Sequence, residues 1–94
     1  MPALCLTGPL TRSEVLERLA WLEARLPGSA QGDSEPVVID LSGLTRVDTS
    51  AVTFMIALER RSRRQGLTLH WKALPASLLA LLRLSSVESL FHLK

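Results

Sequence analysis

Hydrophobic residues occur along the first part of the chain in blocks whose spacing changes from that of a strand to that of a helix. Residues 4–6 form a short apolar strand, and Thr7-Gly8-Pro9 ends it. Thr11 and Glu14 have the spacing of a capping box, in which each side chain bonds the other residue's backbone N–H, so a helix should start here. This helix should end at Pro27-Gly28 and bury one apolar stripe, which consists of Val15, Leu19, Leu22 and Leu26.

The middle of the chain contains a run rich in β-branched residues. Residues 29–35, which precede it, are small and polar without periodicity, and this predicts a mobile surface loop. Residues 37–41 are apolar with little alternation, which is typical of a central strand covered on both faces. A turn at Ser42-Gly43-Leu44 and a link at Thr45-Arg46-Val47 should follow. We therefore place residues 37–41 in the middle of a sheet.

The second half of the chain alternates between helix and strand patterns. A long helix should cover residues 49–65, with Gly66 as its stop. Residues 67–71 alternate as a strand, and Pro75 suits the first turn of another helix. Residues 87–93 predict a short turn and a final strand. Because strands and helices alternate, we expect an α/β fold with right-handed crossovers: a small, mostly parallel sheet of about four strands with helices packed against it.

Length and composition limit the classes of protein to which the chain can belong. Its 94 residues suit one domain, spanning residues 1–94, and 47% of them are hydrophobic, which favours a packed core over disorder. No apolar stretch is long enough for membrane insertion, and the short N-terminal apolar run lacks the basic leader of a secretory signal. Cys5 is the one cysteine and cannot form an internal disulfide, which fits the reducing cytoplasm.

Charge and histidine placement argue against nucleic acid and metal as partners. The net charge is only +2, which is too small to predict nucleic-acid binding. His70 and His92 have no Cys, Asp or Glu at metal-ligand spacing, so we expect no metal, and we expect no cofactor. A basic run near the end of the long helix is either a solvated face or a contact for acidic residues or lipid headgroups, and it contains Arg60, Arg61, Arg63 and Arg64.

Three consecutive residues at the start of the long helix are the strongest candidates for a site. Asp48, Thr49 and Ser50 can each accept a hydrogen bond from the first N–H groups of the helix. One helix needs only one such cap, so hydroxyl groups should remain for a partner. The next two turns are almost entirely apolar. Unless the neighbouring helices cover this surface, we expect an exposed partner-binding patch formed by Val47, Phe54 and Met55.

The segment from Val38 to Val52, which reads VIDLSGLTRVDTSAV, resembles the signature of the STAS domain family. Leu6-Thr7-Gly8-Pro9-Leu10 is similar to an earlier strand of that family, and residues 65–67 and 81–91 are similar to its helix exit and its closing helix and strand. The resemblance therefore covers nearly the whole chain. Ala51 departs from it, because most members have glycine there, and so does the N-terminal segment, which is too short for a further strand.

This resemblance implies a non-enzymatic protein-binding module with two alternative roles. The chain is most similar to the small cytoplasmic subunit of the Mla lipid-asymmetry ABC transporter, which implies a transporter ATPase as partner and a place at the inner membrane through that complex. The alternative is an anti-sigma factor antagonist, in which a partner kinase phosphorylates the residue at the position of Ser50. An enzyme is the weakest interpretation, because Asp40 and Asp48 lack an accompanying nucleophile, histidine relay or phosphate loop.

Overall fold

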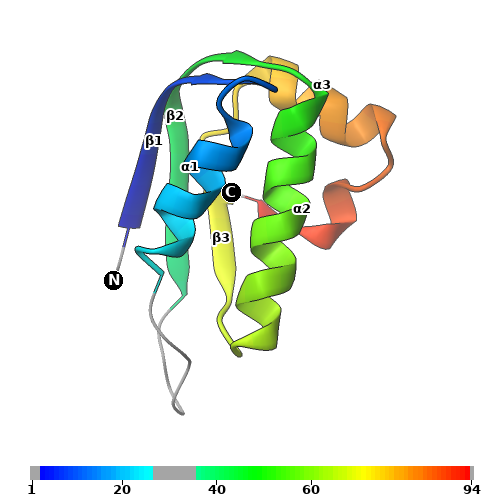
Figure 1. Ribbon diagram of the computed structural model, residues 1–94. Helices are drawn as coiled ribbons and strands as arrows, with labels where there is room; N and C mark the ends of the chain where they lie inside the picture. Colours follow the sequence, from blue (N-terminus) through cyan, green and yellow to red (C-terminus); the bar gives the residue numbers. More distant parts are fainter. Residues whose placement is uncertain (1–2, 27–35, 94) are drawn as a thin grey trace.

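A computed structural model describes residues 3–26 and 36–93, and it shows four parallel strands in one sheet, in the order β1-β2-β3-β4 (Figure 1). A helix connects each strand to the next, so the predicted α/β fold with a small parallel sheet is confirmed. The elements, in chain order, are β1 (Ala3–Leu10), α1 (Val15–Glu23), β2 (Val37–Val47), α2 (Thr49–Arg64), β3 (Leu69–Lys72), α3 (Ala76–Leu84), the 3-10 helix η1 (Glu88–Leu90) and β4 (His92–Leu93).

The core lies between the sheet and the helices. Ile39 of β2 and Trp71 of β3 are both fully buried there, and residues of α1, α2 and α3 belong to the same buried cluster. Strand β2 is in the middle of the sheet, as predicted. Its other face is covered only in part: Val38 is 9% exposed, but the neighbours of Asp40 in register, Cys5 and Lys72, are exposed. Coverage on both faces was therefore predicted correctly for Val38 and wrongly for Asp40.

Strands β1 and β2 are longer than their sequence patterns predict. Thr7-Gly8-Pro9 continues β1 instead of ending it, and residues 42–47, predicted as a turn and a link, continue β2. Shifts in register between Cys5 and Thr7 and between Gly8 and Pro9 accommodate these irregular residues within the pair. Glycine is required where the strands approach closely, because a Cβ atom on Gly43 would lie 2.6 Å from Cγ2 of Thr7.

The helix ends show which local sequence signals were sufficient to predict where a helix begins or ends. Helix α2 ends at Arg64, and Gly66 follows in the left-handed conformation with φ of 74°, so the predicted stop is confirmed. The predicted capping box is half formed: Glu14 accepts from the backbone N–H of Thr11 at 3.2 Å, but the Thr11 hydroxyl donates to Glu14 instead of accepting from its N–H. Helix α1 begins after this turn and ends at Glu23, and the proposed stop and loop at positions 27–35 lie outside the described residues.

Candidate functional site

A cleft of about 680 Å³ lies at the carboxyl ends of β1 and β2, beside the turn that precedes α1 and the first turn of α2. In Figure 1 these strand ends and helix starts meet at the upper end of the molecule. One wall comes from the segment 9–14 and the other from residues 45–50, which include the candidates Val47, Asp48, Thr49 and Ser50. The two walls lie close together because β1 and β2 are parallel neighbours, so the segments that follow them leave the sheet at the same edge.

Asp48 holds the two walls together. Its extended backbone makes it the N-cap of α2, and its carboxylate accepts the backbone N–H of Ser50 at 2.8 Å. The other carboxylate oxygen accepts the backbone N–H of Arg12, from the opposite wall, at 3.1 Å. The hydrogen bond from Arg12 lowers the pKa of Asp48 below its usual value; desolvation opposes this effect, and hydrogen bonds from Ser50 reinforce it. Asp48 is thus the residue of the trio that caps the helix.

The remaining residues of the motif differ in how far they reach the surface. Thr49 is exposed, and its hydroxyl makes no hydrogen bond to any residue in the described part of the chain. Ser50 and Val47 are half-buried, and Val47 packs against the core while still lining the cleft. The structure therefore brings together four of the six predicted site residues and leaves the Thr49 hydroxyl at the surface.

The predicted exposed patch on α2 is wrong for Phe54 and Met55. Their side chains are 1% and 0% exposed and belong to the buried core. Neighbouring helices pack on both sides of α2, because α1 contacts it on one side and α3 on the other. The alternative, that other helices cover this apolar surface, is therefore correct. The long apolar run of α2 reflects its position among the helices, where it contacts the sheet and two neighbouring helices at once.

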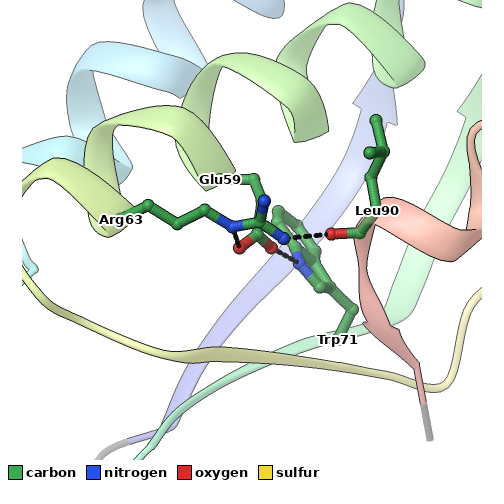
Figure 2. Close-up of polar contacts among 4 residues, drawn as sticks. All are labelled: Glu59, Arg63, Trp71 and Leu90. Carbon is green, nitrogen blue, oxygen red and sulfur yellow. Dashed lines mark hydrogen bonds and ion pairs between the residues drawn. The ribbon is translucent and has the colours of Figure 1, made fainter.

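A buried polar network at the other end of α2 was not predicted. Glu59 is 4% exposed, and its carboxylate accepts the indole N–H of Trp71 at 3.0 Å and Nε of Arg63 at 3.1 Å (Figure 2). Arg63 also donates to the backbone carbonyl of Leu90 at 2.7 Å. The spacing of Glu59 and Arg63, four residues apart, was a visible signal of an ion pair. The pairing with Trp71 had no local signal, since the two residues lie in different elements.

This network changes the interpretation of the basic run and of Trp71. Arg63 is part of the fold, and Arg61 lies 3.6 Å from the carboxylate of Glu23 on α1, so a purely solvated face is wrong for these two residues. Trp71 packs edge-to-face on Phe91 with ring centroids 5.8 Å apart. It is also the hydrogen-bond donor that allows Glu59 to be buried.

Other kinds of site are not seen in the residues that the structure describes. No group of histidine, cysteine and acidic side chains in these ranges could hold a metal ion. None of the helices within them has the length and apolar character needed to cross a membrane. Asp40 lies outside the cleft, and the backbone N–H of Ser42, at 2.9 Å, lowers the pKa of its carboxyl group.

Comparison with known proteins adds one finding to this geometry. The family model described as "Mlab, STAS domain" matches residues 1–92. A search of curated proteins found no match. The matched range contains β1, β2 and the first turn of α2, and therefore both walls of the cleft.

Proposed function

The chain belongs to the STAS domain family, whose model matches residues 1–92, and we propose that it is a non-enzymatic accessory subunit that binds and supports the ATPase of a phospholipid (Mla-type) ABC transporter. The binding surface is the wall of the cleft formed by Val47, Asp48, Thr49 and Ser50. The chain acts in the cytoplasm and is held at the inner membrane only through the transporter complex.

The state of the Thr49 hydroxyl is the observation that carries this proposal. Asp48 satisfies the helix start and ties it to Arg12, so the loop is held in place without the help of Thr49. Thr49 is exposed on this fixed loop, and a partner can bond its hydroxyl without first ordering the segment. A rigid loop with one uncommitted polar group suits recognition of a protein surface better than it suits catalysis, which needs a nucleophile or an acid–base pair.

An anti-sigma factor antagonist is the second candidate, because Ser50 lines an open cleft of about 680 Å³ at a helix N-terminus. A phosphate there would be stabilised by the helix dipole. It would also lie beside the Asp48 carboxylate, which accepts the N–H of Ser50 at 2.8 Å. Negative charges on such close neighbours repel, so phosphorylation would loosen the link between the two walls of the cleft and provide a switch.

Affinity purification of the tagged full chain from its native cell tests the proposal. We expect a transporter ATPase to copurify with the wild type and to be lost with Thr49→Arg, because a long charged side chain obstructs the surface. Thr53→Arg is the matched control, since Thr53 is also exposed on α2 but does not line the cleft. Capture that Thr49→Arg leaves intact contradicts the proposal. Recovery of a sigma-factor regulator, with phosphate on Ser50, establishes the second candidate instead.

A further inference from the structure

A second concave surface lies between α2 and η1, away from the cleft. It is a groove of about 290 Å³, and its apolar lining comes from Ile56, Val87, Leu90 and Phe91. Leu90 is 42% exposed, which is high for a leucine that already packs in a groove. Small-molecule sites are usually of about 300–1,000 Å³ and enclose most of their ligand. A groove at the lower limit of that range fits one or two aliphatic side chains better than a whole small molecule.

The walls of the groove are held in a fixed position by the network in Figure 2. Arg63 spans from Glu59 on α2 to the carbonyl of Leu90 in η1, at 3.1 and 2.7 Å. Trp71 anchors the same carboxylate from the sheet at 3.0 Å. The two sides of the groove are therefore joined through hydrogen bonds, and binding there needs little ordering of the protein.

The charge at the groove identifies the chemistry of its occupant. Glu59 and Arg63 form an ion pair, so their charges compensate each other. Arg60 also lines the groove and is exposed, and it has no ion pair with any residue in the ranges that the structure describes. The groove therefore combines an apolar floor with one uncompensated cation at its edge. A carboxylate next to an aliphatic side chain is the complementary pattern.

We propose that this groove binds a short acidic and apolar segment of a partner protein. An aliphatic side chain of the segment packs on Ile56, Val87 and Leu90, and a nearby Asp or Glu pairs with Arg60. The site lies roughly 15 Å along α2 from Ser50, at about 1.5 Å per residue, so it is separate from the cleft. The inference rests on the proposed function only in treating the chain as a protein-binding module, and it holds for either partner.

Selection of displayed random twelve-residue peptides against the full chain tests the proposal. We expect enriched peptides to contain an aliphatic residue within four positions of Asp or Glu. Fluorescence anisotropy with the most enriched peptide should show that Arg60→Glu weakens binding at least about tenfold, which corresponds to about 1.4 kcal/mol. Arg64→Glu is the matched control, because Arg64 is exposed on the same helix and does not line the groove. It should change the affinity less than about twofold.

Further variants and measurements distinguish this proposal from other occupants of the groove and from the proposal that a partner binds at the cleft. Leu90→Asp should also abolish peptide binding, whereas Thr49→Arg should leave it unchanged, which distinguishes the groove from the cleft. No enrichment, enrichment without acidic residues, or equal binding to Arg60→Glu overturns the proposal. It is also overturned if phosphatidylglycerol vesicles bind through Arg60 while no peptide does, which makes the groove a lipid site. Dimerisation that Leu90→Asp abolishes, in the absence of peptide binding, assigns the groove to a second copy of the chain.

Discussion

Asp48 is the residue at which the sequence motif and the geometry of the cleft coincide. Its carboxylate bonds N–H groups from both walls, and the Arg12 hydrogen bond keeps its pKa below the usual value. A carboxyl group with a lowered pKa in the folded state stabilises the protein above its unfolded pKa, about 3.9. That stabilisation is lost as the pH falls through the lower folded pKa, where the group becomes protonated.

We predict that Asp48→Asn lowers the free energy of unfolding at pH 7, because the amide carries no charge and offers one oxygen to two N–H donors. The difference from the wild type should become smaller as the pH falls below about 4 and the wild-type carboxylate is neutralised. Urea unfolding of both proteins at a series of pH values measures this difference. A difference that stays constant down to the acid limit would show that the charge of Asp48 contributes nothing.

Gly43 is the residue whose missing side chain permits the pairing of β1 and β2. An added Cβ would lie 2.6 Å from Cγ2 of Thr7 and 3.1 Å from the backbone oxygen of Leu6. We predict that Gly43→Ala destabilises the protein by about 1–3 kcal/mol, the usual cost of overpacking. Thr7→Ser removes the nearest methyl group, so the double variant should recover part of the loss in thermal unfolding. Additive effects of the two changes would contradict the steric explanation.

Among the elements, α2 was predicted closely and β1 and β2 were not. The ends of α2 depend on Asp48 and Gly66, whose effects are local, so the sequence was sufficient to place them. The ends of β1 and β2 depend on their mutual register, such as the pairing of Leu10 with Val47. Such pairing joins residues far apart in the chain. Residues typical of turns, such as Thr7-Gly8-Pro9, lie within this irregular strand pair, and the sequence alone does not distinguish them from a true turn.

The same distinction explains which site residues could be predicted. Val47, Asp48, Thr49 and Ser50 are adjacent in sequence, so a local motif places them together at the end of a strand. The exposure of Phe54 instead depends on where α1 and α3 pack, and periodicity on α2 alone cannot give that information. For this reason Val47 and the polar residues of the predicted site lie at the cleft, and Phe54 and Met55 belong to the core.

The end of α3 provides a prediction at the scale of the element. Ser86 has φ of 56°, in the left-handed region, and Val87 donates its N–H to the carbonyl of Leu82 at 3.1 Å. The end of α2 has the same motif with Gly66 in the left-handed position. A residue with a side chain pays roughly 1–2 kcal/mol for this conformation, and glycine does not. Ser86→Gly should therefore raise the free energy of unfolding by about 1 kcal/mol.

The matched variant for this comparison is Gly66→Ala, which should lower the free energy of unfolding by a similar amount, about 1 kcal/mol. Both changes are read from the midpoint of chemical denaturation with an unchanged slope. If Ser86→Gly destabilises the protein, the side chain of Ser86 contributes an interaction that outweighs the backbone strain. The prediction for α3 would then be wrong.

At the scale of the whole molecule, the four parallel strands lie side by side in the order in which they occur in the chain, and the three α-helices pack with the sheet into one core. The cleft lies at the carboxyl ends of β1 and β2, and the groove lies beside the later turns of α2. Helix α2 therefore contributes to both surfaces: its first turn presents Thr49, and its middle presents Arg60. If both proposals hold, two binding surfaces on one helix would allow the chain to contact two segments of an assembly at once.

The hydrogen bond between Glu59 and Trp71 joins α2 to the sheet, so its removal measures how much this link contributes to the stability of the whole molecule. Trp71→Phe keeps an aromatic ring but removes the indole N–H that Glu59 accepts at 3.0 Å. Because Glu59 is only 4% exposed, water cannot readily replace this donor. A buried acceptor that loses its partner typically costs about 1–3 kcal/mol, and more when it is charged. We therefore predict a loss of at least about 1–3 kcal/mol in urea unfolding, in addition to any loss of packing.

A double-mutant cycle with Glu59→Leu separates the hydrogen bond from the packing. Replacing both partners removes the stranded carboxylate, so the double variant should be more stable than the sum of the single changes predicts, by about 0.5–3 kcal/mol. Glu59→Leu also frees Arg63, which is 56% exposed and can be solvated, so this side chain adds little cost of its own. Strict additivity in the cycle would mean that Trp71 contributes to stability through its packing in the core, which includes the contact with Phe91, and not through Glu59. The helix layer and the sheet would then be held together by apolar contact, without a contribution from the carboxylate.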